Sequence, residues 1–369
     1  MIKERIWNVY NLLVVRYLSK KSKLQTSEWR IDNNDEFFQF SNWIDKSVTY
    51  KLNPIVIESS NKKHKWVGAQ FYHGEIFAIP NDETRVLHYD TNVNYIENIR
   101  SGLFKWTGGC VWNDAIYCFP RTASSFLKIN GNNIKEIPLT IEYGEEHHYS
   151  GVCTKDGIVY QPPRNTNHIL KTDLKTGIST KIDIVDEKYN IFFRYCGSII
   201  HPNGLIYFFP ERNNQVIRLD PNTDKWDFIG KKVSTMCFDA KIGIDGNIYG
   251  FSAYNRGVMK IDVIHNTVQM LHEEISPGAY GTKYGVDGCL YSVPGDGNAI
   301  YKYNIENNKI EVVFNLNDKS KAKYAGGCTR INGTIVCISA TENSILCLAP
   351  DKELDIPKEI FDFFFVDCY

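Results

Sequence analysis

Short apolar segments alternate with polar turns along most of the chain, between Trp66 and Pro350. In the clearest stretch the apolar segments fall at residues 195–200, 205–210, 215–220 and 225–229. Each segment is too short for an ordinary helix and is bounded by Gly, Pro, Asn or Asp, which is typical of β-strands joined by tight turns. This stretch therefore predicts four consecutive strands.

The same arrangement recurs seven times and is recognised by an apolar pair in its second segment. The pairs are Ile76-Phe77, Ile116-Tyr117, Val159-Tyr160, Ile206-Tyr207, Ile248-Tyr249, Leu290-Tyr291 and Ile335-Val336. Neighbouring pairs lie 40 to 47 residues apart, a period typical of propeller blades. Because one blade cannot bury both of its faces, seven copies predict an all-β, seven-bladed β-propeller with four antiparallel strands per blade.

Within each repeat the same residue types follow one another: a Gly, an apolar strand, an Asp-Gly turn, an Ile-Tyr pair, a Pro and a Val-x-x-Ile-Asp segment. Asp245-Gly246, Ile248-Tyr249 and residues 258–262 are an example. This succession resembles the kelch-like and NHL-like families of β-propeller repeats over about three quarters of the chain. The resemblance implies the architecture but no particular activity, since such propellers include enzymes, ligand binders and interaction scaffolds.

The segment Ile55-Val56-Ile57 ends nine residues before Trp66, which is the usual distance from an outer strand to the next repeat. It is predicted to complete the last blade beside residues 326–329, 334–338 and 344–348, because propellers avoid exposed edges by pairing strands from both termini. The expected domains are an N-terminal appendage (1–51), the propeller (52–354) and a Phe-rich tail (355–369) that packs on either of them.

An apolar stripe at helical spacing runs through the first residues and includes Ile2, Ile6, Val9 and Leu13. It predicts a small amphipathic helix that docks on the propeller, or that contacts a membrane surface or a partner through its basic side. No apolar segment is long enough to span a bilayer, and the lack of a small-residue cleavage site argues against a secretory signal.

The chain has 369 residues, 13% aromatic residues and a net charge of -1, which argues against a nucleic-acid partner held by bulk charge. Its ten cysteines show no zinc-ligand spacing, and Cys110, Cys153 and Cys328 occupy equivalent positions in their repeats. We interpret these three as small buried apolar residues, which fits a reducing, cytoplasmic location. No metal or cofactor is predicted.

An aromatic residue opens the first segment of every repeat. These residues are Trp66, Trp106, Tyr149, Tyr195, Phe238, Tyr280 and Tyr324. The residue before is basic or a histidine in five repeats, at Lys65, Lys105, His148, Arg194 and Lys323, and loops expected on the same face add Arg85, Arg121, Arg164, Arg212 and Arg256. The aromatic residues are interpreted as wedges between blades or as rings that stack on a ligand, and the basic residues as solvated loop charges or as an anion site.

If these side chains line the mouth of the channel, they predict a ligand with an acidic group and a ring, such as an acidic saccharide, a nucleotide sugar or a phosphorylated metabolite. The predicted ligand-binding residues are Lys65, Trp66, Lys105, Trp106, Tyr149, Arg194, Tyr280, Lys323, Tyr324, Arg121, Arg164 and Arg212. The first functional hypothesis is a binding module for such an anionic small molecule or saccharide, or for a protein partner.

A catalytic alternative rests on the loop Glu145-Glu146-His147-His148. Together with Tyr195 of the next repeat, His148 is expected to serve as acid and base while Arg194 holds a carboxylate, in a metal-independent lyase, epimerase or hydrolase. A polar surface loop is the simpler interpretation of the same residues. The neighbouring His147 and His148 point apart on a strand, so they do not predict a metal site.

Overall fold

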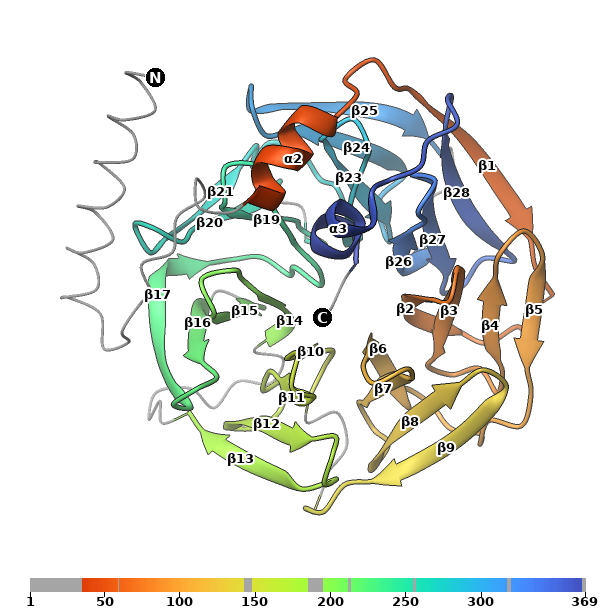
Figure 1. The fold of residues 1–369 in the computed structure, drawn as a ribbon, viewed down its shortest axis with the longest axis vertical. Helices are drawn as coiled ribbons and strands as arrows, with labels where there is room; N and C mark the ends of the chain where they lie inside the picture. Colours follow the sequence, from red (N-terminus) through yellow and green to blue (C-terminus); the bar gives the residue numbers. More distant parts are fainter. Residues whose placement is uncertain are drawn as a thin grey trace.

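The computed structural model describes residues 35–58, 60–142, 148–184, 195–211, 214–254, 257–316 and 320–366, and Figure 1 shows the sheets arranged in a ring around a central axis. The ring contains seven sheets of four strands each, and neighbouring strands within a sheet run antiparallel. Each sheet is one blade. This architecture confirms the predicted seven-bladed β-propeller.

The strands of a blade follow one another from the channel outward. Blade 1 contains β2 (Trp66–Tyr72), β3 (Glu75–Pro80), β4 (Val86–Tyr89) and β5 (Val93–Ile96). Blade 2 contains β6 (Trp106–Val111), β7 (Ile116–Pro120), β8 (Ser125–Asn130) and β9 (Asn133–Pro138). Blade 3 contains β10 (Val152–Cys153), β11 (Ile158–Gln161), β12 (His168–Asp173) and β13 (Ser179–Asp183).

The remaining blades follow the same order. Blade 4 contains β14 (Tyr195–Ile200), β15 (Ile206–Pro210), β16 (Asn214–Asp220) and β17 (Lys225–Val233). Blade 5 contains β18 (Lys241–Ile242), β19 (Ile248–Phe251), β20 (Val258–Asp262) and β21 (Thr267–Leu271). Blade 6 contains β22 (Ala279–Tyr284), β23 (Leu290–Pro294), β24 (Ala299–Asn304) and β25 (Lys309–Asn315). Blade 7 contains β26 (Tyr324–Thr329), β27 (Ile335–Ser339), β28 (Ser344–Pro350) and β1 (Tyr50–Val56).

The last blade closes the ring with a strand from the other end of the propeller. β1 pairs with β28 along its whole length, and Ile55 lies opposite Ile345 (Figure 1). The predicted closure by residues 55–57 is therefore confirmed, with the strand beginning earlier, at Tyr50. β1 covers the edge that β28 would otherwise expose and gives this sheet its fourth strand.

The Asp-Gly turns explain why a tyrosine recurs in the second strand. Gly246 has a φ of +77°, a left-handed conformation that glycine adopts without a steric cost. Asp245 accepts a hydrogen bond from the Tyr249 hydroxyl at 2.7 Å, and Asp287 accepts one from the Tyr291 hydroxyl at 2.8 Å. One repeated polar contact thus fixes the turn to the strand that follows it.

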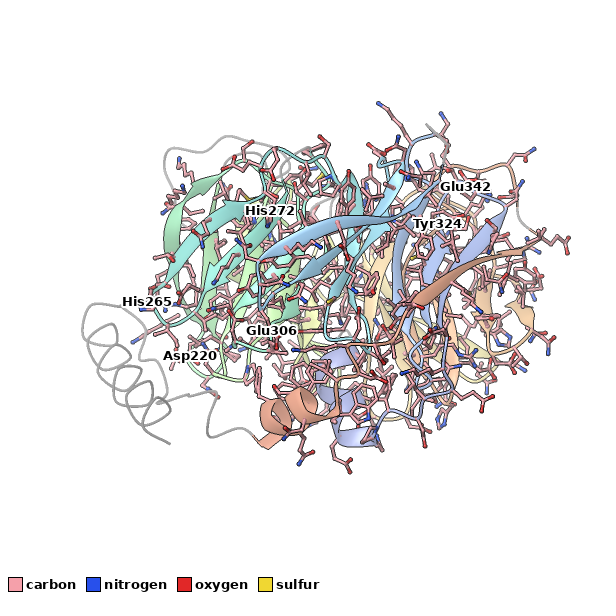
Figure 2. All side chains as sticks on the ribbon, turned by 90° about the horizontal axis from the view of Figure 1, so that it is seen from above. Asp220, His265, His272, Glu306, Tyr324 and Glu342 are labelled. Atoms are coloured by element: carbon pink, nitrogen blue, oxygen red, sulfur yellow. The ribbon has the colours of Figure 1, made fainter. Side chains whose placement is uncertain are left out.

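Two short segments cover one face of the ring (Figures 1 and 2). They are α2 (Asp35–Trp43) and the C-terminal pair of α3 (Lys358–Ile360) and the π-helix η2 (Phe361–Phe365). We call this side the plug face. The opposite side, where Tyr324 and Glu342 lie in Figure 2, is called the open face.

Aromatic side chains hold the plug in place. Phe40 of α2 stacks on Phe364 with ring centroids 4.1 Å apart. Phe361 contacts Phe71 of β2 at 5.0 Å, and Phe364 lies 5.9 Å from Tyr284 of β22. The segment therefore reaches inner strands of blades 1 and 6, and it covers the plug-face end of the channel between them.

The cysteines are buried, as the sequence suggested. The nine cysteines that the structure describes form no disulfide, and Cys110, Cys153 and Cys328 are at most 4% exposed. The predicted amphipathic helix within residues 1–20 lies outside the described part of the chain. Within the described residues, no helix is long and apolar enough to cross a membrane.

Candidate functional site

The first strand of each blade borders the channel, and one of its residues fills the space beside the neighbouring blade. We define this wedge position as the residue opposite the end of the second strand. The pairs are Trp66 with Pro80, Trp106 with Pro120, His148 with Pro163, Tyr195 with Pro210, Ala279 with Pro294 and Tyr324 with Ser339. In blade 5 the bond from Ala253 N to Met236 O matches that from Ala340 N to Lys323 O, which puts Cys237 at the wedge position.

Five wedge side chains form a hydrogen bond with a residue at or near the start of the third strand of their own blade. Trp66 and Trp106 donate from the indole nitrogen to Arg85 O (2.9 Å) and Ser125 O (2.7 Å), Tyr195 donates to Gln215 O (2.9 Å), His148 Nε2 donates to His168 O (3.1 Å), and Tyr324 Oη lies 3.0 Å from Ser344 Oγ. All five are at most 6% exposed. Such burial with a satisfied polar end is the structural role of an aromatic residue in a core.

The structure places the expected acid and base residues between blades. His148 and Tyr195 both occupy wedge positions, and each ring is bound to a backbone carbonyl of its own blade. Neither residue lines the channel cavity. The structure therefore does not bring His148 and Tyr195 together over a shared space, and Trp66, Trp106 and Tyr324 likewise pack between blades rather than at a ligand site.

In three blades the aromatic residue comes one position after the wedge. These residues are Tyr149, Phe238 and Tyr280, which follow His148, Cys237 and Ala279. Side chains alternate along a strand, so a shift of one residue turns the ring from the blade interior to the channel. The equivalent residues of the other blades are mostly small: Val67, Thr107, Cys196 and Ala325. The mouth therefore has aromatic side chains on one side and smaller side chains on the other.

All of the residues that follow a wedge position, except Cys196, line a cavity of about 650 Å³, a volume that includes the open solvent at its mouth. Tyr149, Phe238 and Tyr280 form a continuous aromatic wall, with ring centroids 5.4 Å apart between Tyr149 and Phe238 and 5.0 Å apart between Phe238 and Tyr280. They precede or begin inner strands, as Tyr324 does, so the mouth lies on the open face (Figure 2). The plug at the other end makes the channel a one-ended pocket.

Glycines form the wall opposite the aromatic rings. Gly68, Gly108 and Gly326 line the cavity with φ of +85°, +66° and +72°. A Cβ added to Gly68 would lie 2.9 Å from Gly108 Cα, and one added to Gly326 would lie 2.8 Å from Gly68 Cα. The inner strands of blades 7, 1 and 2 thus approach too closely for a side chain, and they present bare backbone to the cavity.

Deeper in the cavity lies an ion pair. Lys283 Nζ contacts Asp239 Oδ2 at 2.6 Å, and the side chains are 2% and 23% exposed. The carboxylate is therefore the partner that faces the open space, with the ammonium buried beside it. Ser198 also lines the cavity, and its buried hydroxyl has no hydrogen-bond partner among the described residues. We call Asp239, Lys283 and Ser198 the polar floor.

The predicted lysines lie elsewhere. Lys65, Lys105 and Lys323 are each 1% exposed, and none lines the cavity. Their ammonium groups donate to loop carbonyls, those of Thr341 and Glu342 (2.9 Å each) for Lys65, Glu83 (2.8 Å) for Lys105 and Ser320 (2.7 Å) for Lys323. Burial lowers the pKa of Lys105 to about 8. The lysine ammonium groups therefore bind loop carbonyls, and these residues are not part of the cavity lining.

Two of the predicted arginines do reach the aromatic wall. The guanidinium carbon of Arg121 lies 5.0 Å from the centre of the Tyr149 ring, and that of Arg164 lies 4.6 Å from it. Both side chains are largely buried, at 7% and 6% exposed, and Arg121 also covers Phe104 at 4.2 Å. Burial raises the pKa of Tyr149, although the two arginines favour its ionised form. The arginines hold the ring and do not themselves line the cavity.

Other predicted residues fall beyond the described part of the chain. They are Arg194, Arg212 and Arg256, and residues 145–147 of the acidic and histidine loop. The sequence hypotheses also missed Asp239, Lys283 and Ser198. Aligning the repeats by strand pairing would have revealed them, because each lies one to three residues after the residue that follows the wedge position of its blade.

No family model matches the chain, and no curated protein matches it. Several solved structures are similar in fold. A streptogramin B lyase is 14% identical over 82% of this chain and 98% of that one, with a TM-score of 0.66. A catalytically inactive variant of virginiamycin B lyase from Staphylococcus aureus, solved with quinupristin, is 16% identical over 82% and 99%, with a TM-score of 0.67.

An extracellular domain assigned to a one-component system of B. thetaiotaomicron is 10% identical, covers 81% of this chain and 40% of that one, and has a TM-score of 0.63. At these identities the likeness concerns the fold alone, because propellers with different activities share one architecture. The kelch-like and NHL-like resemblance is accordingly supported at the level of architecture. The chain is a seven-bladed β-propeller similar in fold to lyases and to an extracellular domain.

Proposed function

We propose that this propeller is a binding module that takes a small, ring-bearing polar molecule into the cavity of the open face. One observation carries the proposal: the aromatic wall of Tyr149, Phe238 and Tyr280 stands beside the ion pair of Asp239 and Lys283 inside one pocket of about 650 Å³. A concave site with apolar walls and a few polar groups is the usual form of a small-molecule site.

The aromatic wall and the polar floor are proposed to contact different parts of the ligand. A flat ring stacks on an aromatic side chain and gains about 0.5 to 1.5 kcal/mol beyond the burial of its surface. The charged pair and the Ser198 hydroxyl orient the polar edge of the ligand, because hydrogen bonds to charged groups are about twice as strong as neutral ones. Saccharides, including the acidic ones expected from sequence, and nucleoside-like molecules combine a ring face with such an edge.

Ligand-detected NMR with a library of sugars, nucleosides and aromatic acids tests this proposal. Phe238→Ala removes the central ring of the wall, and we expect it to weaken any library ligand at least tenfold, since about 1.4 kcal/mol corresponds to that factor. Phe228→Ala on β17, an aromatic residue of the outermost strand, is the matched control and should leave binding unchanged. Binding that survives Phe238→Ala, or no library ligand at all, would overturn the proposal.

A propeller enzyme is the second candidate, and the position of Asp239 favours it. This carboxylate is 23% exposed inside the cavity, where it could accept a proton from a bound molecule. The acid and base pair expected from sequence does not line this space, so Asp239 replaces it in this hypothesis. New product signals in the same NMR samples, abolished by Asp239→Asn, would support catalysis, and unchanged library spectra after prolonged incubation would count against it.

A further inference from the structure

We infer that the cavity selects a neutral, hydroxyl-rich ring, such as one unit of an uncharged saccharide, over an anion. This inference rests on the proposed function and narrows its ligand class. It departs from the acidic ligand that the sequence suggested. It follows from the contacts that the lysine and arginine side chains near the mouth already make.

The first step concerns the cation of the floor. Lys283 is 2% exposed and lies 2.6 Å from Asp239, so its charge is compensated before any ligand arrives. An incoming carboxylate or phosphate meets the more exposed Asp239 first and is repelled by it. To reach the ammonium, the anion must displace the Asp239 carboxylate from this ion pair, which costs the energy of that contact.

The second step concerns the arginines. Arg121 and Arg164 place their guanidinium carbons 5.0 Å and 4.6 Å from the Tyr149 ring, and neither lines the cavity. Their charge stabilises the Tyr149 ring of the wall. Lys65, Lys105 and Lys323 donate to loop carbonyls and do not line the cavity. Among the described residues, Lys283 is therefore the cation that lines the cavity, and its charge is already matched by Asp239.

The third step is what the cavity does present. The Asp239 carboxylate accepts hydrogen bonds from hydroxyl groups, and the Ser198 hydroxyl can donate or accept one. The aromatic wall supplies a flat apolar surface for the C–H face of a sugar ring, and the glycine wall adds backbone that approaches closely. A ring with hydroxyl groups along one edge can stack on the aromatic wall and form hydrogen bonds with the polar floor at the same time.

An ammonium ligand is the strongest competitor, since aromatic rings beside a carboxylate attract cations. Two features of the cavity disfavour it. The Tyr149 ring already contacts the guanidinium groups of Arg121 and Arg164, and Lys283 neutralises the Asp239 carboxylate. A neutral ligand needs neither of these groups to change its partner.

A glycan array read with the fluorescently labelled full chain tests the inference. The array carries neutral glycans, the same glycans with uronic acid or phosphate groups, and choline-bearing spots. We expect neutral glycans to bind at least tenfold more tightly than their acidic counterparts. Calorimetry with the best free glycan then compares the parent with Asp239→Asn, which should weaken binding at least tenfold, since a hydrogen bond to a charged group is worth about 1.5 to 3 kcal/mol.

Controls separate binding from folding. Asp224→Asn removes an ion pair of equal length, Lys171 to Asp224 at 2.6 Å, on the outer side of blades 3 and 4, and should leave affinity unchanged. Asp239→Asn alone removes the carboxylate that pairs with the buried Lys283 ammonium. The double variant Asp239→Asn, Lys283→Gln removes both charges of this pair. It should fold like the parent and still lose the neutral glycan.

The outcomes distinguish the two proposals. Tighter binding of acidic or choline-bearing spots would overturn the inference, and so would equal affinity of the parent and the double variant for the neutral glycan. If ligand binding is nevertheless weakened by Phe238→Ala, the proposed function still holds. If no spot binds and no NMR library ligand depends on Phe238, both fall.

Discussion

His201 makes the fold sensitive to acid. It follows β14 and is 1% exposed, with Nδ1 accepting a hydrogen bond from the Asn203 backbone N–H at 3.1 Å and Nε2 donating to Gly246 O of blade 5 at 2.9 Å. A ring that accepts at Nδ1 is neutral, because a protonated ring has only donors. Burial lowers the pKa of His201 to about 4, although the Gly246 carbonyl favours the protonated form.

The sign of the pH dependence follows from this shift. The unfolded histidine takes up its proton near the ordinary value of 6.5, whereas the folded one does so only near about 4. Between these values the unfolded state binds more protons, so the stabilisation is complete above 6.5 and is lost as the pH falls toward 4. With these two pKa values the free energy of unfolding falls by about 2 kcal/mol between about pH 7 and about pH 5.

Urea unfolding followed by tryptophan fluorescence measures the effect in the parent and in His201→Gln. Glutamine keeps one donor and one acceptor and does not titrate, so all other groups contribute equally to both proteins. The difference between the two free energies of unfolding should change by about 2 kcal/mol over that interval, with the parent losing more. It should stay constant from about pH 7.5 to about pH 9. Parallel curves through the acidic range would refute the reasoning.

Two further predictions concern packing. Gly68→Ala should cost about 2 to 4 kcal/mol, because its φ is +85° and the new Cβ would lie 2.9 Å from Gly108 Cα. Gly74→Ala, in the same blade with φ +84° and no atom within 4 Å of the new Cβ, should cost only about 1 to 2 kcal/mol, and equal losses in urea unfolding would contradict the close approach of the inner strands. Phe364→Ala should cost about 3 to 5 kcal/mol, since the ring is 3% exposed and stacks on α2, and an unchanged urea midpoint would show that the plug does not stabilise the propeller.

The fold could be predicted because its signal is repeated. A second strand every 40 to 47 residues, each preceded by a turn, defines the number of blades even where one copy is weak. Closure by residues 55–57 followed from the same spacing and is confirmed by the pairing of Ile55 with Ile345. Periodicity averages over many residues, so single exceptions do not change the result.

The site could not be predicted in the same way, because it depends on exceptions. Trp66 and Tyr149 each lie 14 residues before a proline at or just after the end of the second strand, Pro80 and Pro163, and each precedes a glycine by two residues. Sequence spacing therefore treats the two alike. Only the backbone pairing shows that Trp66 faces Pro80 while His148, one residue before Tyr149, faces Pro163. A bulge in the first strand hides this shift from any local pattern.

The shift that builds the aromatic wall also removes large side chains from between the blades. Blade 6 has Ala279 where blades 1 and 2 have tryptophans, and Ala279 belongs to the same buried cluster as Phe40, Phe361 and Phe365 of the plug. Each fully buried phenylalanine contributes about 1.5 to 3 kcal/mol, so the plug adds apolar burial to this cluster at the other end of the inner strand. Blade 6 therefore keeps a continuous buried cluster although Tyr280 lines the cavity.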